Sequence, residues 1–113
     1  SNGYSVNIPL NDTQWYDLII EKDGKFETVQ CKATGSADGS ISLRNKGGTN
    51  GGCYDQVLNH PLDWLFCLNQ NGLMWNIPIE ELRKSGTTNS IRLRTEPNLN
   101  NQGFQTYKYL VTL

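Results

Sequence analysis

The sequence has few residues that could bind zinc or build a disulfide framework. It has three cysteines in no C-x-x-C spacing, and His60 is its one histidine. A structural zinc site needs about four Cys or His ligands at close spacing, so none is expected here. Scattered cysteines are typical of a reducing compartment, and we expect an intracellular, cytoplasmic protein.

Other absences exclude whole classes of protein. No apolar run approaches the ~20 residues of a membrane span, and no signal peptide is visible. The glycine-rich segment 45–52 lacks the G-x-x-x-x-G-K-[ST] order of a P-loop. The formal net charge is −1, so no overall basic field indicates nucleic acid, although cations can still gather on one face.

The sequence does contain the pattern of a β-rich domain. Its 113 residues fit one domain over residues 1–113. Alternating or apolar runs predict strands at 4–8, 15–21, 26–32, 40–44, 63–68, 73–77, 90–94 and 107–113. Residues 78–84 are predicted to form a short helix, because Pro78 suits a first turn and Gly86 follows as a stop.

The apolar run 63–68 is predicted to be a central strand buried on both faces. Asn71-Gly72 then predicts a tight turn to 73–77 as its partner. Trp64 and Trp75 lie in these apolar strands, and we expect both to be packing residues.

A hairpin is predicted between residues 15–21 and 26–32. Asp23-Gly24 is a strong signal for a two-residue hairpin loop, which places Lys22 opposite Lys25.

The same register gathers Asp17, Gln30 and Lys32. Pairing back along the ladder puts Asp17 opposite Gln30, with Cβ atoms roughly 5 Å apart. Side chains alternate along a strand, so Lys32 projects to the same side as Gln30. A carboxylate, an amide and an ammonium on one face form a candidate site for a hard cation and a phosphate.

The order Asp17…Gln30-Cys31-Lys32 resembles the signature of the PD-(D/E)xK nucleases. In that family an Asp opens one strand of a central hairpin, and (Glu, Asp or Gln)-x-Lys lies on the next. Segments 16–20, 29–32, 63–66 and 75–82 are similar to the Gln-bearing branch, which includes group I intron homing endonucleases, with archaeal Holliday-junction resolvases as relatives. The resemblance covers about residues 3–95. It implies an α/β (α+β) domain of the restriction-endonuclease type, with a mixed β-sheet and few flanking helices.

The resemblance also implies roles for individual residues. Asp17 would bind Mg²⁺, or Mn²⁺ in its place, together with the Gln30 amide oxygen and the Cys31 backbone carbonyl. Lys32 would orient or polarise the attacking water, or would contact the scissile phosphate. Such a metal lowers the pKa of water and neutralises charge developing on the phosphate. Since Mg²⁺ usually keeps several waters, one or two carboxylates suffice.

One departure from the family pattern leaves alternatives open. Family members commonly add a Glu from a helix that precedes the first strand, and this sequence starts beyond that point. Either the helix lies upstream, or another acid (Asp12, Asp38 or Glu27) substitutes, or the site is weak or inactive. Strand alternation turns Glu27 away from Gln30, which argues against it.

Several cations suit contacts to a DNA backbone. Arg44 and Lys46 flank the glycine-rich loop, and Arg92 and Arg94 share one side of a predicted strand. Lys and Arg on phosphates give affinity without sequence information. An ordinary solvated loop explains Arg44 and Lys46 equally well.

Other residues can be explained by structure alone, without a functional role. An Asp–Lys pair across strands is often only a surface ion pair. Trp15 is expected to be a core or rim aromatic that faces Lys32, and His60 a solvated loop residue. The Thr34 hydroxyl could cap a turn or reach a phosphate, and Asp63 could fix the start of a strand.

The predicted function is metal-dependent hydrolysis of DNA by a homing-endonuclease-like enzyme, with DNA as partner and no membrane. Cutting both strands implies a homo-oligomer. The alternatives are an inactive nuclease-fold module that binds nucleic acid or a protein, and a nuclease toxin domain.

Overall fold

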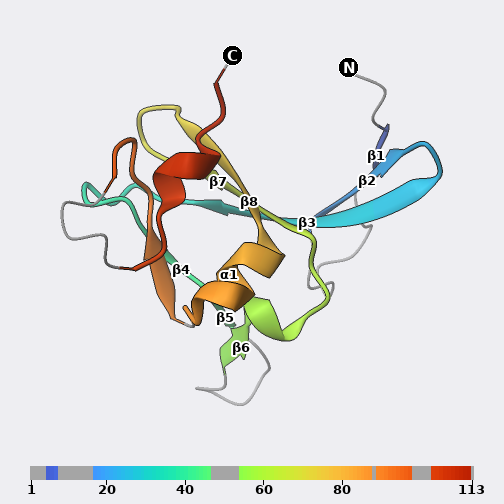
Figure 1. The fold of residues 1–113 in the computed structure, drawn as a ribbon, viewed down its shortest axis with the longest axis horizontal. Helices are drawn as coiled ribbons and strands as arrows, with labels where there is room; N and C mark the ends of the chain where they lie inside the picture. The colour runs from blue at the N-terminus through green and yellow to red at the C-terminus, as the bar shows by residue number, and fades with distance from the viewer. Residues whose placement is uncertain (1–4, 8–16, 47–53, 88, 98–102, 113) are drawn as a thin grey trace.

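The computed structural model describes residues 5–7, 17–46, 54–87, 89–97 and 103–112. Its main element is a five-stranded sheet in the order β1-β2-β3-β7-β8 (Figure 1). These strands are β1 (Ser5–Asn7), β2 (Leu18–Lys22), β3 (Lys25–Ala33), β7 (Trp64–Leu68) and β8 (Met74–Pro78). Strands β3 and β7 are parallel and the other neighbours antiparallel, so the predicted mixed sheet is confirmed.

Smaller elements lie beside this sheet. Two two-stranded ribbons pair β4 (Ser40–Ser42) with β9 (Ser90–Arg92) and β5 (Arg44–Lys46) with β6 (Tyr54–Gln56). The described helices are α1 (Ile79–Ser85) and the 3₁₀ turns η1 (Val57–Asn59) and η2 (Thr106–Tyr109). The β2–β3 hairpin projects away from the body that these elements form (Figure 1). Within the described part of the chain, no helix has the length and hydropathy of a membrane span.

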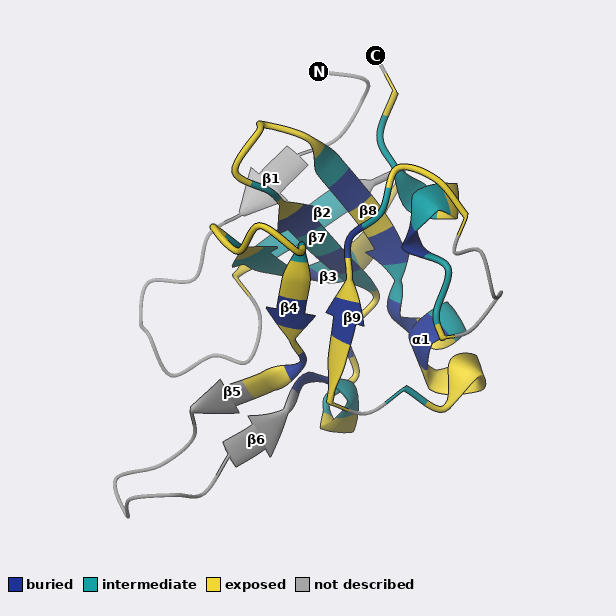
Figure 2. Cartoon of the chain, turned by 90° about the vertical axis from the view of Figure 1, so that its left-hand side faces the viewer, coloured by how far each residue is buried: buried dark blue, intermediate teal, exposed yellow. Residues whose placement is uncertain are grey.

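The core lies on one face of the β7–β8 half of the sheet (Figure 2). Alternate residues of β7 and β8 are buried there, and α1 and the β4–β9 ribbon contribute further apolar side chains. The buried cluster consists of Ile41, Leu43, Val57, Leu62, Leu65, Cys67, Trp75, Ile77, Ile79, Leu82, Ile91 and Leu93.

The prediction that residues 63–68 are buried on both faces is wrong. Leu65 and Cys67 are fully buried, whereas Trp64 and Phe66 are half-buried and Leu68 is exposed. The reason is that the core cluster gathers on the Leu65 and Cys67 face of β7.

The parallel pairing of β3 with β7 is fixed at both ends. At one end the Thr28 N–H donates to Asp63 Oδ2 (2.9 Å), and the Asp63 N–H donates to the Thr28 carbonyl (3.2 Å). At the other end the Thr34 N–H donates to the Leu68 carbonyl (3.0 Å). Asp63 therefore fixes the start of strand β7, as the sequence suggests.

The predicted helix is confirmed as α1. Pro78 precedes it in an extended conformation, and Gly86 ends it in the left-handed region with φ 76°. A non-glycine residue would be strained there. Arg83 anchors the helix to η1, because its guanidinium donates to the carbonyls of Leu58 and His60.

Two strand predictions are wrong. Residues 40–44 divide into β4 and β5, because the chain turns at Leu43, which is fully buried. The described part of the predicted strand 107–113 is not a strand: η2 occupies its start, and a bridge joins Leu110 to Trp75. Residues 15 and 16 and the loop at 47–53 lie outside the described residues.

The buried hydroxyl of Thr106 explains why η2 replaces a strand. Its Oγ1 accepts a hydrogen bond from the Arg94 N–H (2.9 Å) and donates to the Arg92 carbonyl (2.7 Å). The indole N–H of Trp75 donates to the Arg94 carbonyl (3.0 Å). Side chains from β8 and η2 thus satisfy backbone groups at and just after the end of β9.

Candidate active site

The turn of the β2–β3 hairpin is the one that the sequence predicts. Asp23 and Gly24 are the loop residues, with φ of 53° and 82°. Both values are left-handed, as a two-residue type I′ loop requires. The register continues from this turn back to Leu18 opposite Val29.

Asp17 lies just before β2, at the base of the hairpin. Its N–H donates to the Val29 carbonyl (2.9 Å), so the expected ladder pairing with Gln30 stops one residue early. Its carboxylate nevertheless reaches β3, where Oδ2 accepts hydrogen bonds from Gln30 Nε2 and from the Cys31 N–H, both 2.8 Å. The structure therefore places Asp17 and Gln30 side by side.

The site contains groups whose oxygens could bind a hard cation. Gln30 turns its nitrogen toward Asp17, and rotation about its soft terminal torsion would present Oε1 instead. The N–H and C=O of one strand residue point to the same edge, so the Cys31 carbonyl lies on the Asp17 side of β3. Carboxylate, amide and carbonyl oxygens are the ligands that Mg²⁺ takes.

The site has one carboxylate among the described residues. No group of three His, Cys, Asp or Glu side chains in the described ranges could hold a metal ion. A cation at Asp17 would therefore depend on neutral oxygens, water and a substrate phosphate for its remaining ligands.

Lys32 is half-buried on the same face of β3 as Gln30. Burial lowers the pKa of Lys32 below its ordinary value, and the negative charge of Asp17 opposes that shift. A lysine with a lowered pKa exchanges its proton more readily near neutral pH.

Sequence reasoning missed Cys67, the residue of β7 that pairs with Lys32. Burial raises the pKa of the Cys67 thiol to about 12, so the thiol stays neutral beside the ammonium. No local pattern could have revealed this neighbour, because a parallel pairing joins strands that are far apart in the sequence.

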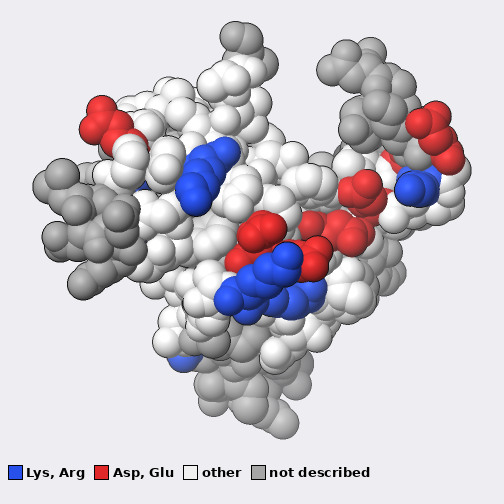
Figure 3. All heavy atoms as spheres, viewed as in Figure 1, with Lys and Arg blue, Asp and Glu red and all other residues white. Residues whose placement is uncertain are grey.

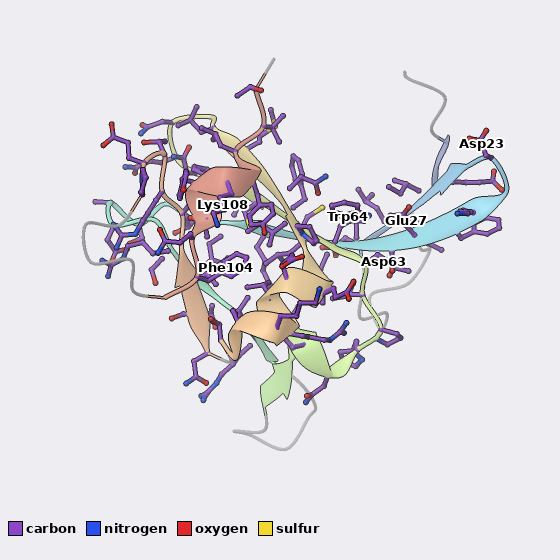
Figure 4. The ribbon with its side chains drawn as sticks, in the orientation of Figure 1. Asp23, Glu27, Asp63, Trp64, Phe104 and Lys108 are labelled. Carbon is purple, nitrogen blue, oxygen red and sulfur yellow. The ribbon has the colours of Figure 1, made fainter. Side chains whose placement is uncertain are left out.

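Glu27 does not belong to the site. It faces the other side of β3, where its carboxylate accepts a hydrogen bond from the Trp64 indole N–H (Figure 4). Trp64 is therefore half-buried and donates a hydrogen bond through its indole N–H, in addition to the packing role that its apolar surroundings predict. Trp75, by contrast, is 1% exposed and belongs to the core.

The other candidate acids have structural partners or lie outside the description. Asp38 accepts hydrogen bonds from the Ser36 hydroxyl (2.5 Å) and the Ser40 N–H (2.9 Å). These two bonds lower the pKa of Asp38. Asp12 lies outside the described residues.

Two side chains that the sequence offers as phosphate contacts form hydrogen bonds within the protein. The Thr34 hydroxyl accepts from the Ser36 N–H (3.0 Å), which makes it a turn cap. Arg44 donates to Asn89 Oδ1 (2.8 Å) and so ties β5 to the residue before β9. The side chain of Lys46 lies outside the description.

Charges of both signs are interspersed on the face shown in Figure 3. Over α1, Lys84 lies 3.6 Å from a Glu80 oxygen and 3.9 Å from a Glu81 oxygen. This face is therefore a poor candidate for binding a polyanion.

Comparisons with known proteins identify the family and the fold of the chain. A family model described as PD-(D/E)XK endonuclease matches residues 1–109. The solved structure of the bacterial homing endonuclease I-Ssp6803I superimposes with a TM-score of 0.72 at 18% identity, over 96% of this chain and 76% of that chain. At that identity the likeness shows a shared fold, of the restriction-endonuclease type that the sequence predicts. A search of curated proteins found no match.

Proposed function

The chain belongs to the PD-(D/E)XK endonuclease family, and on that premise we propose that it hydrolyses DNA phosphodiester bonds with a divalent cation. The observation that carries the proposal is the Asp17 carboxylate, held 2.8 Å from both the Gln30 amide and the Cys31 N–H. The half-buried Lys32 follows on the same face of β3.

Each residue has a role that its position supports. Asp17 would bind the cation, and the Gln30 amide oxygen and the Cys31 carbonyl would add neutral ligands. The bound cation, Mg²⁺ or Mn²⁺, supplies a Lewis acid that neutralises charge on the phosphate. Lys32 would donate hydrogen bonds to a phosphate oxygen and exchange a proton with water at Nζ, for which its lowered pKa suits it.

The substrate and the assembly follow from the family and the fold neighbour. A nuclease acts on nucleic acid, and we propose duplex DNA because the neighbour is a homing endonuclease. Cleavage of both strands would need two such sites, which a homo-oligomer supplies. A second carboxylate from Asp12 or from a preceding helix would strengthen cation binding at Asp17.

A second candidate function is an inactive nuclease-fold module that binds nucleic acid. The single carboxylate at the described site favours it, because one carboxylate binds a divalent cation weakly.

Nicking of supercoiled plasmid separates the two functions. The full chain is incubated with plasmid in Mg²⁺, in Mn²⁺ and in a chelator, beside Asp17→Ala and the matched control Glu80→Ala. Glu80 is an exposed acid on α1, so its loss changes the net charge equally outside the site. We expect metal-dependent nicking that Asp17→Ala lowers at least ~100-fold and that Glu80→Ala retains.

The opposite results are equally informative. Nicking that survives in Asp17→Ala would place the chemistry elsewhere. A folded chain that binds DNA and nicks in neither metal would support the inactive module.

A further inference from the structure

The outer side of β9 carries a cluster of hydrogen-bond donors remote from the hairpin turn. Ser90, Arg92 and Arg94 alternate with the buried Ile91 and Leu93, so their side chains point out of the core. Across the ribbon, Ser40 pairs directly with Arg92 and Ser42 with Ser90. Hydroxyl and guanidinium groups therefore share one surface.

A hollow of about 230 Å³ opens on this surface. Its polar lining comprises Ser40, Thr87, Ser90, Arg92 and Arg94, and Phe104 adds an aromatic side chain. No Asp or Glu is among the described lining residues. Phe104 lies in the body of the molecule, away from the Asp23 turn (Figure 4).

The two arginines project from a backbone that is firmly held. The Thr106 hydroxyl bonds to the backbone of both Arg92 and Arg94, and the Trp75 indole binds the Arg94 carbonyl. Thr106 and Trp75 are 0% and 1% exposed. Side chains that start from a fixed backbone lose less freedom when they bind a ligand.

Size and charge indicate what the hollow would hold. Pockets for drug-sized ligands and cofactors measure about 300–1,000 Å³, so this one suits a smaller group. Arginine guanidinium groups match phosphate oxygens in a bidentate geometry, and serine and threonine hydroxyls also donate to phosphates. Arg92 also forms an exposed ion pair, because its Nη2 lies 3.8 Å from Asp38 Oδ2.

We propose that this hollow is a second phosphate site, which takes one backbone phosphodiester of the DNA away from the scissile bond. Arg92 and Arg94 bind its oxygens, Ser40 and Ser90 donate hydrogen bonds, and the attached sugar packs against Phe104. The inference rests on the proposed function. A contact of this kind fixes how the duplex lies on the enzyme without reading its sequence.

Salt dependence of DNA binding tests the site. The full chain is titrated into a fluorescent mixed-sequence duplex without divalent metal, from about 50 to 200 mM salt, and anisotropy gives Kd. Arg94→Ala should weaken binding and reduce the slope of log K against log salt by about 0.9, the value of one lost phosphate contact. The control Lys84→Ala removes a cation from α1 and should leave the slope unchanged.

Asp38→Asn is a second variant, chosen because misfolding could also explain a loss of DNA binding in Arg94→Ala. The substitution removes the charge beside Arg92 and keeps an oxygen that can accept from the Ser40 N–H. We expect DNA binding to tighten about two- to threefold, as for loss of one weak surface charge. A misfolded variant would not gain affinity.

The outcomes separate this inference from the proposed function. Wild-type chain that binds no DNA overturns the second site, and the nicking assay in Mg²⁺ and Mn²⁺ then decides the proposed function. Wild-type binding with an unchanged slope in Arg94→Ala and unchanged affinity in Asp38→Asn overturns the second site alone, and the nicking assay then still decides the proposed function.

Discussion

One face of the sheet is apolar and buried on β7 and β8 but polar and half-buried on β3 (Figure 2). On β7 and β8 the face carries Leu65, Cys67, Trp75 and Ile77, each 1% exposed or less. On β3 the residues beside Leu65 and Cys67 are Gln30 and Lys32, which are polar and half-buried.

The difference shows how a polar site can be held in place by pairing with a strand of the hydrophobic core. Strand β3 is the boundary, because one of its neighbours is a core strand and the other belongs to the projecting hairpin. Gln30 and Lys32 are held by a ladder whose next strand, β7, packs Leu65 and Cys67 into the core, yet their own side chains remain half exposed. Stability should therefore depend on the β7–β8 half and activity on the β2–β3 half.

The largest effect should come from Trp75, the largest fully buried side chain. Trp75→Ala removes its packing and the hydrogen bond to the Arg94 carbonyl, and we expect a loss of about 3–5 kcal/mol in the free energy of unfolding. Trp75→Phe keeps most of the packing and should cost less. Urea unfolding measures both, and a loss below about 1 kcal/mol for Trp75→Ala would contradict the division between the halves.

Cys67 should make stability depend on alkaline pH. Its folded pKa of about 12 lies above the ordinary value of 9.0, so its contribution is complete below pH 9 and declines as pH rises toward 12. The decline is at most about 1.4 kcal/mol per pH unit. The lowered pKa of Lys32 acts in the opposite sense, because raising the pH removes a buried charge.

Cys67→Ala isolates this contribution. The variant should be less stable at pH 7, but its melting temperature should fall less steeply than that of the wild type from pH 9 to 11. Parallel curves for the two proteins would show that the thiol does not titrate on unfolding.

The smallest effect on stability should come from Asp17. Its side chain is exposed, and Asp17→Asn retains an oxygen that can accept the hydrogen bond from the Cys31 N–H. We expect the free energy of unfolding to change by less than about 1 kcal/mol. Thermal melts of the two proteins check this, and a drop above about 2 kcal/mol would mean that the hairpin site also supports the core.

Local signals in the sequence predict the hairpin and the helix. Asp23-Gly24 fixes the β2–β3 register because the turn type requires left-handed φ at both positions, and Pro78 and Gly86 bound α1 in a similar way. The residues of the candidate site follow from that register, since one short turn connects their two strands.

What the sequence could not reveal depends on distant partners. Residues 107–113 have the alternation of a strand, but the buried Thr106 hydroxyl binds the backbone of β9 and the chain turns into η2. Trp64 lies in an apolar run, yet Glu27 on the neighbouring strand accepts its indole N–H. Such contacts override local propensity.

The parallel pairing of β3 with β7 has a consequence for the order of folding. The β2–β3 hairpin closes a short loop, on a timescale of about 1–10 μs for hairpins in general. The chain passes through β4, β5, β6 and η1 before β7 can pair with β3, and such non-local contacts form slowly. Asp17 and Gln30 can therefore meet early, whereas Lys32 enters its partly desolvated position beside Cys67 only when β7 arrives. The burial that lowers the pKa of Lys32 is thus acquired only with β7, and a chain in which β7 has not yet paired would carry a more solvated lysine there.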